Sequence, residues 1–144
     1  MSHAGGDLAP GTREWTELRA RALAAMEHAY APYSQFRVGA AVLGSDGSIS
    51  DGCNMENASY PAGMCAERAA IAAAVARGVR EFKAIVIATE ADTPTPPCGV
   101  CRQVLMEFAP RLTVLSVTRA GDEAQWLISD LLPHAFTPTS LGRR

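Results

Sequence analysis

The chain has 144 residues, of which 48% are hydrophobic and 19% charged, and its formal net charge at pH 7 is −2. This length suits one domain with a single core, and the low charged share leaves room for surface covered by partner subunits. No run of Lys and Arg is long enough to grip a phosphate backbone, so a nucleic-acid substrate is disfavoured.

No apolar stretch approaches the ~20 residues that span a bilayer, so no membrane association is expected. The segment Met1 to Gly11 has no apolar core like that of a signal peptide. We therefore expect a cytoplasmic protein whose thiols stay reduced and available to a metal.

The spacing of apolar residues and breakers predicts elements in the order α-β-β-α-β-α-β-β. Residues 1–11 are expected to form a flexible tail, and Thr12 is expected to cap the first helix. The remaining predicted elements are that helix up to Pro32, strands at 36–43 and 49–54, a helix from Cys65 to Arg77, a strand at 82–89, a helix from Cys98 that ends before Pro110, strands at 113–118 and 124–127, and a last turn capped by Ser129.

This order predicts an α/β fold, a three-layer α/β/α sandwich with a five-stranded mixed sheet. We find no repeat and no linker, and expect one domain over residues 12–138 and a C-terminal tail over 139–144.

The most informative pattern combines three cysteines with a glutamate. Cys65 and Glu67 are separated by one residue, and Pro97-Cys98-Gly99-Val100-Cys101 follows about thirty residues later. Three thiolates leave one of the four zinc positions open for water, and a nearby carboxylate can handle that water's protons. Both motifs stand where a loop enters a helix, and helix N-termini favour thiolates. A Cys-x-x-Cys pair alone is also compatible with a redox pair or half of a structural zinc site.

Three thiolates on Zn²⁺ give a net charge of −1, which opposes lowering the pKa of a bound water. Arg68 follows Glu67 directly and is expected to donate hydrogen bonds to the cysteine sulfurs, although it can also be a surface arginine. Cys53 has no partner at ligand spacing, and we interpret it as a buried structural thiol.

With these motifs, the chain resembles the small, homotetrameric, zinc-dependent cytidine deaminases over nearly all of residues 15–136. The likeness includes Tyr30-Ala31-Pro32-Tyr33-Ser34-Gln35-Phe36, Val38-Gly39-Ala40-Ala41, Gly52-Cys53-Asn54-Met55-Glu56-Asn57 and Leu131-Leu132-Pro133-His134-Ala135-Phe136. The zinc motif is typical of the wider deaminase superfamily, whereas the segment from Cys53 to Asn57 indicates free nucleosides.

The resemblance implies a site and a reaction. Cys65, Cys98 and Cys101 bind one Zn²⁺ per subunit, and Glu67 is the proton shuttle. The implied substrate contacts are Phe36 in the pocket wall, Asn54 and Glu56 at the ribose, the backbone of Ala66 at the base carbonyl, and Phe136 in a neighbouring subunit's site. The implied reaction, in pyrimidine salvage, is hydrolysis of cytidine and deoxycytidine to uridine and deoxyuridine with release of ammonia, through attack of zinc-bound hydroxide on C4.

Elementary chemistry agrees in part. A carboxylate at Glu56 can accept hydrogen bonds from sugar hydroxyls and would repel a 5′-phosphate. An aromatic ring such as that of Phe136 offers a face to a pyrimidine, but Phe36 and Phe136 can also be core residues, and Asn54 and Glu56 a turn residue and a solvated acid.

The chain departs from the family pattern at His134 and at Pro61, and neither position is a predicted ligand. Two alternatives remain open from the residues. One is a deaminase of the blasticidin S type, which shares Cys65-Ala66-Glu67 and the Pro-Cys-Gly-x-Cys-Arg motif, and the other is a non-catalytic zinc or thiol module.

Overall fold

The structure is a computed structural model that describes residues 9–143. Most of the predicted N-terminal tail therefore lies outside the described residues. The elements in chain order are α2 (Thr12–Met26), β1 (Val38–Gly44), β2 (Ile49–Cys53), the 3₁₀ turn η1 (Tyr60–Ala62), α3 (Ala66–Ala76), β3 (Phe82–Thr89), α4 (Gly99–Phe108), β4 (Thr113–Thr118), β5 (Glu123–Leu127), α5 (Ile128–Leu131) and the 3₁₀ turn η2 (Pro138–Leu141).

The five strands form one sheet in the order β2-β1-β3-β4-β5. Strands β3 and β4 run parallel, and the other three neighbouring pairs are antiparallel, so the sheet is mixed as predicted. Helix α4 lies between β3 and β4 in the chain, as a parallel pair requires a crossover. The central strand β3 is buried along nearly its whole length, which explains its continuous apolar sequence.

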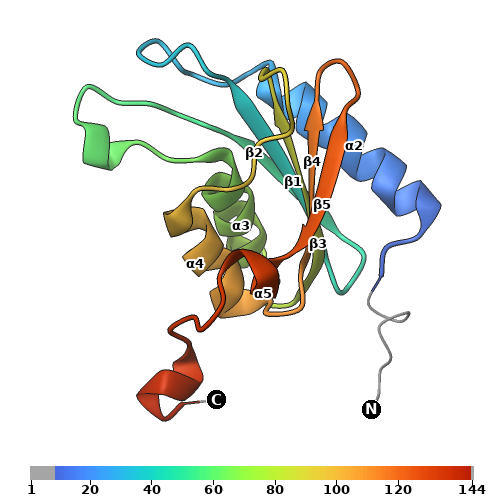
Figure 1. Cartoon of the computed structure of the whole chain (residues 1–144), viewed down its shortest axis with the longest axis vertical. Coiled ribbons are helices and arrows are strands. Elements are labelled where there is room, and N and C mark those ends of the chain that lie inside the picture. Colours follow the sequence, from blue (N-terminus) through green and yellow to red (C-terminus); the bar gives the residue numbers. More distant parts are fainter. Residues whose placement is uncertain (1–8, 144) are drawn as a thin grey trace.

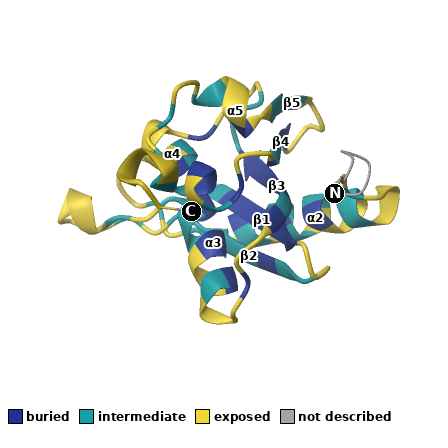
Figure 2. Cartoon of the chain, turned by 90° about the horizontal axis from the view of Figure 1, so that it is seen from below, coloured by how far each residue is buried: buried dark blue, intermediate teal, exposed yellow. Residues whose placement is uncertain are grey.

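Helices cover both faces of the sheet, which confirms the predicted three-layer sandwich (Figure 1). Alternate side chains of a strand point to opposite faces. Ala41 and Leu43 of β1 therefore pack with Leu18 of α2. Ala40 and Val42 face the other layer, where α3 and α4 complete a second cluster. Figure 2 shows the buried strands between the half-exposed helices. No helix within residues 9–143 has the length and apolar character needed to cross a membrane.

The first helix differs from the prediction at both ends. Gly11, not Thr12, precedes its first turn, because the Gly11 amide donates a hydrogen bond to Glu14 Oε1 at 2.8 Å. The helix ends at Met26, well before Pro32. The Tyr30 amide instead donates to the carbonyl of Asn54 at 3.0 Å, which joins this segment to the end of β2.

The prediction that Ser129 caps the last helical turn is also wrong. Leu127, not Ser129, precedes α5, and Ser129 lies within its single turn. The expected tail over 139–144 contains most of η2, which Gly142 closes in a left-handed conformation with φ of 73°.

Candidate metal centre and active site

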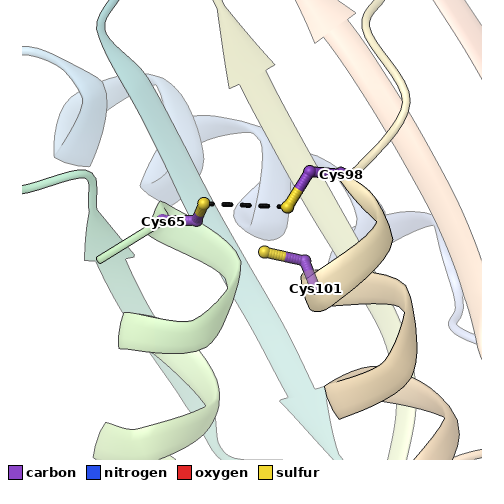
Figure 3. A group of neighbouring side chains, drawn as sticks. All are labelled: Cys65, Cys98 and Cys101. Carbon is purple, nitrogen blue, oxygen red and sulfur yellow. Dashed lines mark hydrogen bonds between the residues drawn. The ribbon is translucent and has the colours of Figure 1, made fainter. Parts of the chain in front are cut away.

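Three cysteines meet between the N-terminal ends of α3 and α4 (Figure 3). Cys65 immediately precedes α3, Cys98 immediately precedes α4, and Cys101 lies in the first turn of α4. Their sulfur atoms all lie within 4.8 Å of one another, and 3.9 Å separates the Sγ atoms of Cys65 and Cys98. Cys53 is not part of this group and is half-buried rather than buried.

The sulfur group has the dimensions of a zinc site. A tetrahedral centre with metal–sulfur bonds of about 2.3 Å holds its ligand atoms about 3.8 Å apart. The spacing of 3.9 Å between Cys65 and Cys98 is close to that value. The three thiols therefore fit one Zn²⁺ and leave a fourth position, for which no further His, Cys, Asp or Glu within residues 9–143 joins the group.

The charge around the sulfurs also favours a cation. Hydrogen bonds from the Cys101 thiol, and then from Arg68 and the Cys98 thiol, lower the pKa of Cys65 to about 5. The same contact, together with burial, raises the pKa of Cys101, because a second thiolate beside the first is disfavoured. A divalent cation removes this conflict by stabilising all three thiolates at once.

Arg68 extends from α3 towards the sulfurs. Its Nη2 lies 3.5 Å from Cys65 Sγ, and the side chain is half-buried rather than on a solvent-exposed face. Its Nε is buried without a hydrogen-bond partner. The guanidinium thus places positive charge beside a group of anionic ligands, as withdrawal of charge from three thiolates requires.

Glu67 lies in the first turn of α3 and is only 6% exposed. Burial is the main cause that raises the pKa of its carboxyl to about 7, and a hydrogen bond from its own backbone amide opposes the shift. The Cys65 charge raises this pKa further, and the Arg68 charge lowers it. A carboxyl group poised near neutrality can both accept and donate a proton.

A cavity of about 210 Å³ lies beside these groups. It brings together five of the predicted substrate and catalytic residues with two of the cysteines, namely Phe36, Asn54, Glu56, Ala66, Glu67, Cys65 and Cys98. Ala66 is the first residue of α3, so its backbone N–H has no partner inside the helix and is free to bind a ligand carbonyl. A hollow of about 310 Å³, lined by Tyr33 and Tyr60 among others, adjoins the cavity at Ser34 and Glu56.

Asn54 bonds the backbone that carries Phe36. Its Oδ1 accepts from the Val38 amide and its Nδ2 donates to the Phe36 carbonyl, both at 2.8 Å. The amide group keeps one N–H and one lone pair for a ligand.

Glu56 anchors the preceding loop in a similar way. Its Oε1 accepts from the amides of Tyr33 (2.9 Å) and Ser34 (3.1 Å), and its Oε2 accepts from the Ser34 hydroxyl. These bonds, led by that of the Ser34 hydroxyl, hold the pKa of Glu56 below its usual range, so the carboxyl is ionised at neutral pH.

Comparison with known proteins identifies the family. The model of the family described as "Cytidine and deoxycytidylate deaminase zinc-binding region" matches residues 13–117. The chain belongs to the cytidine deaminase family. A cytidine deaminase of Sporosarcina psychrophila is 44% identical over 127 residues, which are 88% of this chain and 93% of that protein. One of Halalkalibacterium halodurans is 47% identical over 122 residues, 84% of this chain and 92% of that protein.

A solved structure shares the fold. The cytidine deaminase of Burkholderia pseudomallei aligns with a TM-score of 0.81 at 48% identity, over 84% of this chain and 98% of that one. The predicted resemblance to cytidine deaminases is therefore confirmed. The predicted zinc cofactor is confirmed too, because the matched family region binds zinc and the three sulfurs are positioned to hold one metal ion.

The sequence did not predict the whole lining of the cavity in this cytidine deaminase family member. Phe136, which is expected in a neighbouring subunit's site, lies beyond α5 in the chain, is 59% exposed, and is not among the residues that line the cavity of its own chain. Ser34, Thr89, Thr95 and Pro96 line the cavity and were not predicted. The signal for Ser34 was present, since it stands in the family-like segment from Tyr30 to Phe36. Thr95 and Pro96 lie in a proline-rich loop whose path only the fold determines.

The two departures from the family pattern lie outside the sulfur group. His134 has a positive φ of 54°, a conformation that costs a non-glycine residue free energy. Pro61 lies in the short turn η1, beside Tyr60 of the adjoining hollow.

Proposed function

We propose that this protein catalyses the hydrolytic deamination of free cytidine and deoxycytidine to uridine and deoxyuridine, with release of ammonia, in pyrimidine salvage. The observation that carries the proposal is the buried carboxyl of Glu67 beside three clustered cysteines at one cavity, in a chain of the cytidine deaminase family. The domain proposed to carry this activity spans residues 12–138, and its reduced thiols suit a cytoplasmic location.

Each residue near the cysteines has a proposed task. Cys65, Cys98 and Cys101 would hold Zn²⁺, which when bound lowers the pKa of a water and so supplies the nucleophile. Glu67 accepts the proton that the attacking water loses and delivers it to N3 of the base, and it then helps to protonate the departing amine. The Ala66 amide binds the base carbonyl, and Arg68 withdraws charge from Cys65.

The far side of the cavity suits a ribose without a phosphate. Asn54 and Glu56 retain hydrogen-bonding capacity towards sugar hydroxyls. Glu56 is ionised, and the described residues that line the cavity include no lysine or arginine to balance a 5′-phosphate. We therefore expect nucleosides to be preferred over deoxycytidylate.

Ultraviolet absorbance with purified protein tests this proposal. Cytidine, deoxycytidine, deoxycytidylate and blasticidin S are compared at equal concentration, with Glu67→Ala as the inactive control. Loss of the cytidine signal with wild type alone supports the proposal. Turnover of blasticidin S but not cytidine would replace it with the antibiotic-type reaction, and no turnover of either by zinc-loaded protein would favour a binding module.

We infer that the active form is a homotetramer in which Phe136 enters the site of a neighbouring subunit. Two observations support this inference: the family resemblance, and a side chain that is 59% exposed although aromatic. Subunits carrying Phe136→Ala and subunits carrying Glu67→Ala are each expected to be impaired. Refolded together, the two variants should regain activity. In a mixed oligomer, the intact Phe136 of a Glu67→Ala subunit can enter the site of a Phe136→Ala subunit, whose Glu67 is intact. A monomer by sedimentation, or no gain on mixing, would contradict shared sites.

A further inference from the structure

The segment that carries Phe36 is held from two sides. On one side, Asn54 bonds the Phe36 carbonyl and the Val38 amide, as described above. On the other side, Glu90 Oε1 accepts the backbone N–H of Arg37 at 3.1 Å. Val38 and Thr89 form the pair at one end of the β1–β3 hydrogen-bond ladder. The bond from the Arg37 amide to Glu90 lies one residue beyond that end.

Glu90 also binds the side chain of Arg37. Its Oε2 accepts from Arg37 Nε at 3.0 Å and from Arg37 Nη2 at 2.7 Å. Arg37 contacts Glu27 at 3.3 Å, and Arg119 contacts both Glu27 (2.6 Å) and Glu90 (3.3 Å). Two arginines and two glutamates thus form a closed ring of alternating charge that joins α2, β1, β3 and β4 at their ends.

The backbone beside this ring is strained. Gln35 has a positive φ of 57°, which is unfavourable for a residue with a side chain. Such a conformation persists only where the surroundings hold it. Glu56 bonds the backbone before Gln35 and Glu90 bonds the backbone after it, so the two carboxylates fix both ends of the strained segment.

We propose that Glu90 is a positioning residue for the substrate cavity, acting through Arg37 to hold the Phe36 ring against the ligand. Phe36, Val38 and Thr89 line the cavity, whereas Arg37 and Glu90 stand directly beside them in the chain and do not. Exposed ion pairs contribute little to stability on their own. The ring is therefore expected to act on the shape of the cavity more than on folding. This proposal rests on the proposed function, because its kinetic consequence assumes turnover of cytidine.

Amide hydrogen exchange tests the anchor without any activity. Exchange in a peptide covering residues 34–38 is compared in zinc-loaded wild type, Glu90→Ala and Glu123→Ala. Glu123 also accepts two hydrogen bonds from one arginine, Arg19, in an ion pair that joins α2 to β5, and its side chain is 35% exposed against 22% for Glu90, so it is the control. Glu90→Ala should accelerate exchange at the Arg37 amide, and Glu123→Ala should not. Equal exchange in all three proteins would overturn the proposal even if cytidine is not the substrate.

Kinetics then separates positioning from catalysis. Loosening the cavity wall weakens substrate and transition state alike, so Glu90→Ala should raise KM for cytidine about three- to tenfold with kcat nearly unchanged. Glu90→Gln keeps the side-chain shape, so its KM for cytidine should also rise, but by less than in Glu90→Ala. Because this variant is expected to fold normally, a rise in its KM is not explained by misfolding. In a Phe36→Leu background the effect of Glu90→Ala should largely disappear, since the two act through one contact.

Three results would contradict the kinetic part. These are a fall in kcat with KM unchanged, an equal rise in KM for Glu123→Ala, or additive effects of Glu90→Ala and Phe36→Leu. Zinc content is measured for every variant, so that metal loss is not mistaken for a change in the cavity wall.

Discussion

Replacement of Gly52 by alanine should disturb the active site by displacing helix α3, whose N-terminal end carries Cys65 and Glu67. Gly52 lies in β2, where helix α3 crosses it closely enough that only a hydrogen fits. A Cβ at this position would lie 2.7 Å from both Ala69 Cβ and Ala70 N of the helix. Because one of these atoms is backbone and the other is fixed to it, no side-chain rotation can relieve the contact.

The size of the disturbance follows from these distances. Carbon atoms in ordinary contact lie at least about 3.5 Å apart, so α3 must move by about 0.8 Å relative to β2. Overpacking of this kind typically destabilises a protein by about 1–3 kcal/mol. Cys65 and Glu67 lie within about one turn of the contact, and a displacement near 1 Å can lower the rate on the order of a hundredfold. We expect kcat/KM for cytidine to fall at least tenfold.

Gly99→Ala is the matched control. It is the same chemical change at the start of α4, between two of the cysteines, but its Cβ would meet no atom within 4 Å. Thermal midpoint, zinc content and kcat/KM are measured for both variants at one protein concentration, because an oligomer's apparent stability depends on it. If Gly52→Ala matches Gly99→Ala in all three quantities, the close packing of α3 on β2 is refuted.

Other predictions concern the metal and the charged groups. Removal of zinc with a chelator should abolish turnover and lower the thermal midpoint, and added Zn²⁺ should restore both; activity that survives complete removal would refute a metal role. Arg68→Gln should weaken zinc binding or turnover on the order of 10–100-fold, whereas Arg77→Gln at the far end of α3 should not, as competition with a chromophoric chelator would show. The hydrogen bond from Arg37 holds the pKa of Glu90 below its usual range, so its stabilisation is present at neutral pH and lost as pH falls through the folded-state pKa. The difference in thermal midpoint between wild type and Glu90→Gln should therefore become smaller below about pH 4. A difference that becomes larger there would contradict a stabilising role of the ionised Glu90.

Local signals in the sequence were sufficient to predict the elements that carry the centre of the site. Cys65 and Cys98 each precede a helix, and the run from Phe82 to Thr89 is apolar between polar breakers, so spacing and composition predict them directly. The bounds of β3 and β4 agree with the prediction for the same reason.

Contacts between distant segments could not be predicted in this way. Arg37 and Glu90 meet only because β1 and β3 pair in a register that ends at Val38 and Thr89. The early end of α2 depends on the bond between the Tyr30 amide and the Asn54 carbonyl, which local helix propensity does not contain. Phe136 illustrates the opposite limit, since the role proposed for it lies in another subunit's site, and the packing of one chain shows only that its ring is exposed.

The most direct test of the account compares cytidine turnover by wild type and Glu67→Gln at equal, measured zinc content. Glutamine keeps the size of the side chain but cannot accept and pass on the proton, so the account predicts full zinc occupancy with turnover reduced about 10²–10⁴-fold. A zinc-loaded Glu67→Gln variant that deaminates cytidine at a rate close to that of wild type would contradict the role of Glu67 as the proton shuttle.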